Sequence, residues 1–186
     1  MTILGIDPGT NIMGYAVLKS QGRHSEIVTL GVVKMNRQSN QEEKLKTIFE
    51  RVRELIITYQ PDTLAIEEPF YGKNPQSMLK LGRAQGVVIG ACLQSGLSIH
   101  EYTPRRVKQS ITGRGGASKE QVAAMLHSMY DFSTDTKYLD ATDALGIAVC
   151  HHLQNGIELP QVKTARVKGG SWAAFLAQNQ DRIIRK

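Results

Sequence analysis

The sequence predicts an α/β protein with a mixed five-stranded sheet and flanking helices. Three apolar segments near the N-terminus are separated only by short turns, which is typical of an antiparallel meander. Two further apolar segments then alternate with segments of helical periodicity, which is typical of parallel β-α-β units. Strands that begin as a meander and continue as such units indicate a sheet of mixed strand direction.

The strands are expected where short β-rich segments end at turn residues. The turn Pro8-Gly9-Thr10-Asn11 separates the first segment from the second, and Gln21-Gly22 separates the second from the third. The five expected strands, in chain order, cover approximately residues 2–7, 13–19, 26–35, 63–67 and 98–102.

The helices are expected where apolar residues recur every three or four positions. The clearest set begins at Leu45 and ends at Tyr59, before Pro61-Asp62, with charged residues between its members. Ser118 and Gln121 form a capping-box pattern that marks another helix start. The remaining expected helices cover about residues 75–94, about residues 104–111, and a final segment from Asp140 to the His151-His152 pair.

The chain has 186 residues, enough for one domain with its own hydrophobic core. We expect one globular domain over residues 1–156 and a basic extension over residues 157–186. The extension carries six Lys and Arg against two acidic residues, and the whole chain has a formal net charge of +6. This basic balance favours a polyanionic partner such as nucleic acid.

Cys92 and Cys150 both lie in apolar segments, so we expect buried thiols rather than a disulfide framework. The N-terminus lacks the basic and apolar pattern of a signal peptide. The longest apolar stretch, around residues 87–93, is too short to cross a bilayer. We therefore expect a cytoplasmic protein with no membrane partner.

Four acidic residues stand where an apolar core would not favour them. Asp7 and Glu67 each close an expected apolar strand. Asp140 and Asp143 lie one turn apart on a mostly apolar helix. Unpaired buried carboxylates are costly, but carboxylates that meet at one edge of a sheet can share divalent cations. Oxygen ligands select Mg²⁺ or Mn²⁺, and two such ions could clamp a phosphodiester while one acid orients or deprotonates the attacking water.

Each acid also has a purely structural interpretation. Asp7 could cap the Pro8-Gly9 turn, and Glu67 could be solvated at its strand end. Asp140 or Asp143 could be favoured at a helix N-terminus by the helix dipole. The four acids together are harder to explain in this way than any one of them alone.

Four sequence blocks, in chain order, resemble the RuvC family of Holliday-junction resolvases. Together they run from residue 3 to residue 152, and three of them contain the acids. The blocks are Gly5-Ile6-Asp7-Pro8-Gly9-Thr10 with Gly14-Tyr15; Ala65-Ile66-Glu67 with Phe70, 73–74 and 79–86; Tyr102-Thr103-Pro104 with 107–109, 113–115 and 117–122; and Asp140-Ala141-Thr142-Asp143-Ala144-Leu145.

The resemblance implies a ribonuclease-H-like fold and a homodimer. It implies paired symmetric nicks in a four-way DNA junction, made during homologous recombination and DNA repair. It also implies Mg²⁺ as cofactor, which Mn²⁺ can replace, with two ions per active site. The RuvA–RuvB branch-migration complex becomes the implied partner.

The same resemblance assigns roles residue by residue. Phe70 matches an aromatic residue that stacks or wedges at the junction. Lys108 and Lys119 match basic residues that meet the phosphate backbone near the site. The family's catalytic, metal-binding acids match Asp7, Glu67, Asp140 and Asp143.

The DNA-facing positions are also physically reasonable. Phe70 and neighbouring Tyr71 suit stacking on an unpaired base, although aromatic residues after a strand are also typical of a core. Lys108 and Lys119 can offset phosphate charge near the acids, and Arg114 is a similar candidate with weaker support. Ordinary solvated basic residues would show the same pattern.

Three points stay open in the sequence. Glu68 adds an extra acid beside the catalytic glutamate and could compete as a ligand. His151 and His152 are expected as helix-end residues rather than ligands. The small residues Gly82, Gly86 and Gly90 could pack against a second copy of the chain or within one subunit.

Three other functions fit parts of the pattern. An actin-like ATPase would need a second phosphate motif and an adenosine-binding loop, and neither is found. A catalytically silent junction-binding protein would be marked by the loss of an acid, and all four are present. A related nuclease acting on RNA or RNA–DNA hybrids differs from a junction resolvase only in its substrate.

Overall fold

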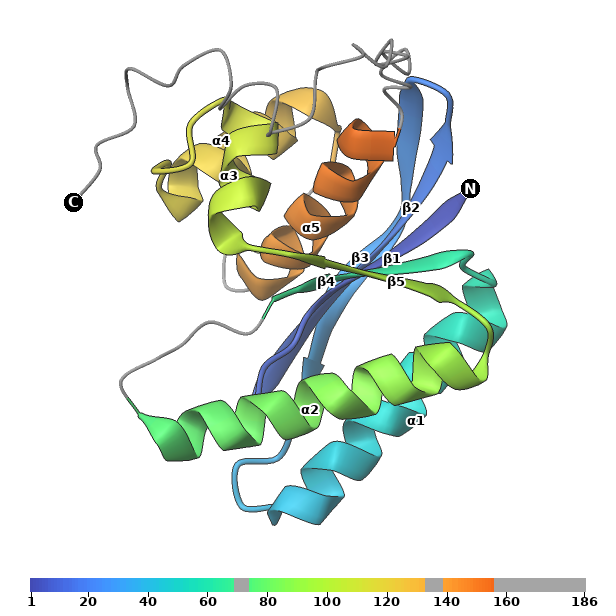
Figure 1. Cartoon of the computed structure of the whole chain (residues 1–186), viewed down its shortest axis with the longest axis vertical. Helices are drawn as coiled ribbons and strands as arrows, with labels where there is room; N and C mark the ends of the chain where they lie inside the picture. Colours follow the sequence, from blue (N-terminus) through green and yellow to red (C-terminus); the bar gives the residue numbers. More distant parts are fainter. Residues whose placement is uncertain (69–73, 133–138, 156–186) are drawn as a thin grey trace, which may run out of the picture.

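The chain folds around one five-stranded sheet with the strand order β3-β2-β1-β4-β5 (Figure 1). The computed structural model describes residues 1–68, 74–132 and 139–155. The strands are β1 (Thr2–Asp7), β2 (Ile12–Gln21), β3 (His24–Lys34), β4 (Thr63–Glu67) and β5 (Ser98–Tyr102). β2 pairs antiparallel with β1 and β3, whereas β4 pairs parallel with β1 and β5. The predicted mixed five-stranded sheet is confirmed.

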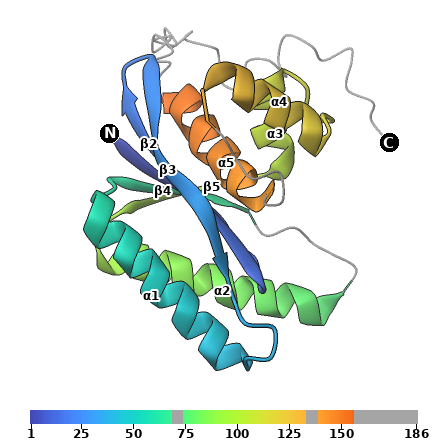
Figure 2. The ribbon, with the colours of Figure 1, turned by 180° about the vertical axis from the view of Figure 1, so that it is seen from behind.

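Helices cover both faces of the sheet. They are α1 (Gln41–Tyr59), α2 (Pro75–Gln94), α3 (Pro104–Thr112), α4 (Lys119–Met129) and α5 (Leu139–Asn155). Figures 1 and 2 show α1 and α2 on one face and α3, α4 and α5 on the other, with α5 closest to the strands. Each helix layer encloses its own apolar cluster against the sheet.

Side chains alternate between the two faces along each strand. Leu4 of β1 belongs to the apolar cluster on the α1 and α2 face. Ile3 of β1 and Ala65 of β4 belong to the cluster on the α5 face. The period of two therefore places Asp7, at the end of β1, and Glu67, at the end of β4, on the α5 face.

Two glycines allow α5 to approach the sheet closely. A Cβ atom on Gly14 of β2 would overlap the carbonyl oxygen of Asp140. A Cβ atom on Gly5 of β1 would overlap the carbonyl oxygen of Ala144. The backbone of the first turns of α5 therefore rests directly on β1 and β2, at a separation that only glycine permits.

The C-terminal half of α5 is tied to the sheet by two buried histidines. Hydrogen bonds join Tyr102 Oη to His151 Nδ1 (2.6 Å) and Ser20 Oγ to His152 Nδ1 (2.8 Å). Burial, with the nearby charges of His100 and His152, lowers the pKa of His151 to about 4. Both histidines hold the end of α5 in place.

Side-chain caps set the helix starts. The predicted capping box is confirmed, because Ser118 accepts from the Gln121 N–H and the Gln121 side chain accepts from the Ser118 N–H. α1 begins earlier than the predicted Leu45, because Asn40 and Glu43 form a second capping box that the apolar spacing does not reveal.

Both cysteines are free and buried, as expected. Among residues 1–68, 74–132 and 139–155, no helix combines the length and the apolar character needed to cross a membrane. The predicted domain boundary at residue 156 and the basic extension over residues 157–186 lie outside the described residues.

Candidate active site

Two acidic side chains come together because of strand register. β1 and β4 run parallel, and Ile6 is paired with Ile66. One residue further on, Asp7 and Glu67 end their strands on the same face of the sheet. Neighbouring strands lie about 4.8 Å apart, so the two carboxylates are neighbours.

A third acid comes from α5. The backbone of Asp140 rests on Gly14, which is paired with Asp7 across β1 and β2, so the first turn of α5 is held beside the end of β1. Asp143, one turn later, lines the same pocket as Asp7 and Glu67. Asp140 is half-buried and does not line this pocket, although its charge contributes to the raised pKa of Asp7.

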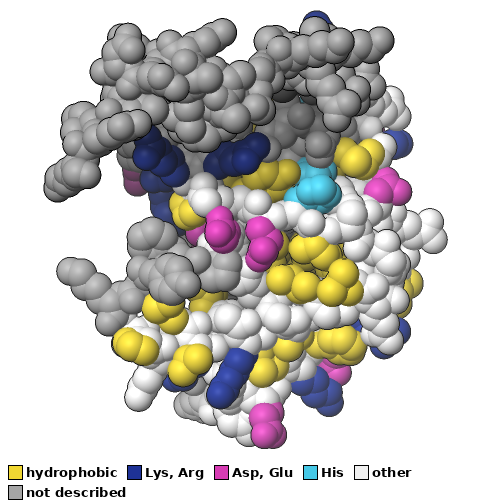
Figure 3. Space-filling view, in the orientation of Figure 1, with side chains coloured by type: hydrophobic (Ala, Val, Ile, Leu, Met, Phe, Trp, Pro, Cys, Tyr) yellow, Lys and Arg dark blue, Asp and Glu magenta, His cyan; other side chains and the backbone are white. Residues whose placement is uncertain are grey.

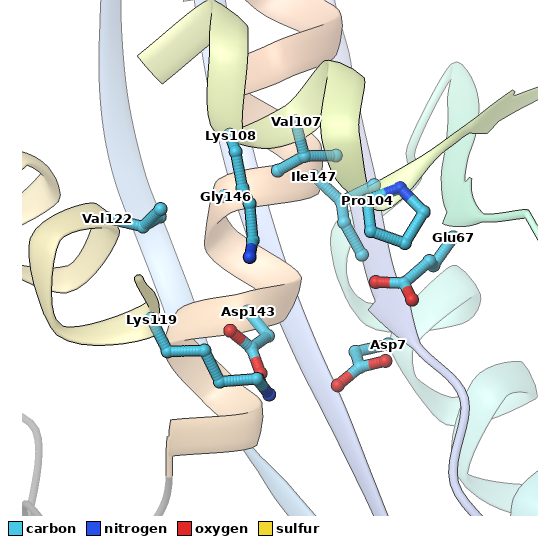
Figure 4. Close-up of a pocket in the computed structure, with 10 residues that line it drawn as sticks. All are labelled: Asp7, Glu67, Pro104, Val107, Lys108, Lys119, Val122, Asp143, Gly146 and Ile147. Atoms are coloured by element: carbon cyan, nitrogen blue, oxygen red, sulfur yellow. The ribbon is translucent and has the colours of Figure 1, made fainter. Parts of the chain in front are cut away.

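The three carboxylates face a common space in this pocket. Figure 4 shows Asp7, Glu67 and Asp143 pointing into it, with the Lys119 amine beside Asp143 and the Lys108 amine directed toward the same space. The other lining residues, largely apolar, are Pro104, Val107, Val122, Gly146 and Ile147. Five elements thus contribute charged groups to one site: β1, β4, α3, α4 and α5.

An ion pair already occupies part of the site. Lys119 Nζ donates to Asp143 Oδ2 over 2.5 Å. The Lys119 side chain is 59% exposed, whereas that of Asp143 is only 20% exposed, so the lysine is the partner that can swing away. Partial burial disfavours the charge on Lys119, but the hydrogen bond to Asp143 and the charges of the nearby acids together outweigh it and raise the lysine pKa.

Acidic and basic side chains lie close together on one face of the molecule. Figure 3 shows acidic side chains near the middle of that face, below a group of Lys and Arg side chains. Lys108 and Lys119 line the acid pocket itself. A rim of positive charge around a carboxylate pocket suits an anionic ligand that reaches the acids together with cations.

Burial and mutual repulsion disfavour the ionised forms of two of the acids. Burial, and then the charges of Glu67 and Asp143, raises the pKa of Asp7 to about 8, against the opposing charge of Lys119. Burial and the charge of Asp143 also raise the pKa of Glu67, against Lys119 and Lys108. Without a further cation, the pocket therefore favours a protonated Asp7 near neutral pH.

The donor set fits a hard divalent cation. Carboxylate oxygens are the ligands that Mg²⁺ and Mn²⁺ prefer, and three of them face one space. In the part of the chain that the structure describes, however, no three His, Cys, Asp or Glu side chains are grouped tightly enough to hold a metal ion as they stand. Binding by all three acids would require side-chain rotation and the release of Asp143 by Lys119.

The remaining predicted residues that the structure describes, Arg114 and Glu68, lie outside the acid pocket. Arg114 does not line the acid pocket but a separate shallow pocket between the end of α3 and α4. Glu68 does not line the acid pocket either, and its N–H donates to the Tyr102 carbonyl. Phe70 and Tyr71 lie outside the described residues.

Sequence reasoning missed two kinds of residue at this site. One is the apolar wall, which includes Val107 and Ile147 and which resembles ordinary core in the sequence. The other is Gln85 of α2, a buried polar residue that donates to the Glu67 carbonyl. Its only sequence signal was its place in a family-like block.

Comparison with known proteins assigns the chain to a family. Residues 3–151 match the family described as "Crossover junction endodeoxyribonuclease RuvC". The chain belongs to this family. Relatives of that name from Cytophaga hutchinsonii and Bacteroides fragilis are each 49% identical, over 181 and 184 residues; the matches cover 97% of this chain and 87% and 95% of the respective relatives.

A solved RuvC structure shares the fold. It is described as T. thermophilus RuvC in complex with Holliday junction substrate, and it is 30% identical to this chain with a TM-score of 0.78. The match covers 84% of this chain and 95% of that one. The expected RuvC resemblance and ribonuclease-H-like fold are confirmed.

The close packing of α5 on Gly14 can be tested by adding one methyl group. Gly14→Ala should lower the free energy of unfolding by about 1–3 kcal/mol, because the new Cβ has to push the Asp140 carbonyl away. Urea denaturation would measure the loss. Gly116→Ala is the matched control, since a Cβ there meets no described residue within 4 Å. Equal stability of Gly14→Ala and wild type would contradict the close approach of α5.

The raised pKa of Asp7 predicts a pH-dependent stability. Folded Asp7 keeps its proton up to about pH 8, whereas the unfolded chain releases it near 3.8. Its stabilising contribution is therefore complete below about pH 4 and is lost as the pH rises to about 8. Without divalent cations, Asp7→Asn should be more stable than wild type at pH 8, by about 1 kcal/mol or more.

Urea denaturation of both proteins from pH 4 to pH 9 measures this difference. It should shrink toward zero at the acidic end, and Asp131→Asn, which changes an exposed acid, should show no such trend. An Asp7→Asn variant that is less stable than wild type at pH 8 would show that Asp7 is not strained by its neighbours.

Proposed function

We propose that this protein is a divalent-metal-dependent endonuclease that resolves Holliday junctions by paired symmetric nicks. The observation that carries the proposal is the meeting of Asp7, Glu67 and Asp143 in one pocket beside Lys108 and Lys119. Membership of the RuvC family supports the reaction class. The junction complex of the T. thermophilus protein supports the substrate.

In this proposal the acids act as metal ligands. Asp7, Glu67 and Asp143 supply oxygen ligands from the pocket, and Asp140 joins them from one turn away on α5. When bound, two Mg²⁺ ions, or Mn²⁺ in their place, supply polarisation of the scissile phosphodiester and activation of water. A divalent cation among the carboxylates offsets their mutual repulsion, so its binding would favour the ionised form of Asp7 over the protonated form.

The basic and aromatic residues act on the DNA. Lys119, once released from Asp143, has a free ammonium group at the mouth of the site to meet a phosphate oxygen. Lys108 reaches the same pocket from α3. Phe70 and Tyr71 follow the catalytic strand β4 and are proposed to stack on unpaired bases, with Arg114 as a more distant phosphate contact.

Paired nicks require two sites, and α2 offers a surface for a second copy. One side of this helix exposes Leu79 (64%) and Leu93 (58%). Between them, a Cβ atom added to Gly82, Gly86 or Gly90 would meet no described residue within 4 Å. A smooth apolar strip of this kind allows two helices to pack closely, and a twofold axis there would match the symmetry of a four-way junction. The homodimer, its cooperation with RuvA–RuvB and its cytoplasmic location belong to the same proposal.

Cleavage of a synthetic mobile four-way junction tests the function. Wild type should nick opposing strands symmetrically with Mg²⁺ and not with EDTA. Asp7→Asn should lower the rate by more than about 100-fold, since even the hydrogen-bond partners of metal ligands contribute about 10–100-fold. Junction binding, measured by mobility shift in Ca²⁺, should be retained, and Asp131→Asn should cut like wild type.

The other outcomes separate the competing functions. Tight junction binding without cleavage would identify a catalytically silent binding protein. Preferential cutting of an RNA–DNA hybrid duplex in a parallel assay would identify a hybrid nuclease. Strong residual cutting by Asp7→Asn would rule out the proposed metal site.

A charged side chain introduced among Gly82, Gly86 and Gly90 on α2 tests the homodimer. Gly86→Arg should convert the protein from dimer to monomer in sedimentation analysis, because the long charged side chain separates the two helices. Single nicks should then replace paired nicks. Thr58→Arg, an equal change on the exposed side of α1, is the control. A dimeric Gly86→Arg protein would place the interface elsewhere.

A further inference from the structure

A buried glutamine connects α2 to the strand that carries Glu67. Gln85 is only 3% exposed, although it lies on a helix whose neighbouring positions Gly82 and Gly86 face outward. Burying a side-chain amide is costly unless its polar atoms are hydrogen-bonded. The hydrogen-bond partners of Gln85 therefore explain how an amide is accommodated at this buried position.

Both partners of the Gln85 amide are acceptors. Gln85 Nε2 donates to the backbone oxygen of Glu67 over 3.2 Å and to Glu101 Oε1 over 2.9 Å. A carbonyl and a carboxylate can only accept, so the amide nitrogen has to face them both. Glu101 thus fixes the orientation in which Gln85 presents its second hydrogen to Glu67.

The same peptide group is held from its other end. The N–H of Glu68 donates to the backbone oxygen of Tyr102 over 2.9 Å. The carbonyl of Glu67 and the N–H of Glu68 belong to one planar peptide unit, so Gln85 and β5 hold both of its polar groups. This peptide is the first one after β4 ends. It follows Glu67 and Tyr102, the last residues paired between β4 and β5.

We propose that Gln85 is a positioning residue for the carboxylate of Glu67. Fixing this peptide fixes the backbone of Glu67, and with it the direction in which the side chain enters the acid pocket. A strand end without such a bond could rotate about its last backbone dihedrals and move the carboxylate away from Asp7. The inference rests on the proposed role of Glu67 as a metal ligand.

Metal binding by the folded, DNA-free protein tests this role independently of cleavage. Gln85→Met removes the donor and keeps the side chain's length and apolar packing. It should weaken Mn²⁺ binding, measured by calorimetric titration, by about 10-fold. The Mg²⁺ concentration for half-maximal junction cleavage should rise similarly, while junction binding in Ca²⁺ stays unchanged. Gln94→Met, the same change at an exposed position on α2, should alter neither quantity.

A double-variant cycle separates positioning from general loosening of the fold. If Gln85 acts through Glu67, adding Gln85→Met to Glu67→Gln should change Mn²⁺ affinity no further, whereas independent effects would add. Additive losses, or wild-type Mn²⁺ affinity in Gln85→Met, would overturn the inference. Glu101→Ala provides a second test at an exposed residue, should Gln85→Met fail to fold, and it should weaken Mn²⁺ binding in the same direction.

The outcome is distinguishable from a failure of the proposed function. If wild type binds Mn²⁺ and Gln85→Met binds it more weakly, the positioning role holds even when no junction is cut. If wild type cuts junctions and Gln85→Met keeps both its Mn²⁺ affinity and its Mg²⁺ requirement, the function stands and the role of Gln85 is rejected.

Discussion

Repulsion between carboxylates in a partly buried pocket is the constraint on which the rest of this structure depends. Asp7, Glu67 and Asp143 face one space, and burial with mutual repulsion raises the pKa of Asp7 to about 8. Such a site is unfavourable unless protons or cations enter it. Lys119 neutralises one of the three acids, and the remaining strain is what divalent cations can relieve.

The fold maintains this strain through rigid contacts. Parallel pairing of β1 with β4 sets Asp7 beside Glu67, and a close-packed sheet cannot slip by one residue without exchanging its two faces. Gly5 and Gly14 hold the backbone of α5 against the strands, which fixes the distance of Asp143 from Asp7. The acids are therefore gathered by the backbone, and only their side-chain rotamers and Lys119 are left to change when a ligand binds.

The sequence allowed much of this to be predicted, for identifiable reasons. Asp7 and Glu67 each end a short apolar strand, so their shared edge follows from the order of elements. The strand and helix order was confirmed, while α1 begins earlier than predicted because a polar cap, Asn40, precedes its apolar stripe. The position of Asp140 outside the pocket depends on the rotation of α5, which spacing alone leaves open. Gln85 resembles a surface glutamine by composition and spacing, and its buried hydrogen bonds become visible in the structure.

The position at which a divalent cation binds tests the role of the acids most directly. Anomalous scattering from crystals grown with Mn²⁺ would locate the ions without reference to activity. If the acids are metal ligands, Mn²⁺ will lie between the carboxylates of Asp7, Glu67 and Asp143, with Lys119 turned away from Asp143. Mn²⁺ bound elsewhere, with Lys119 still paired to Asp143 and the acid pocket free of metal, would contradict this role.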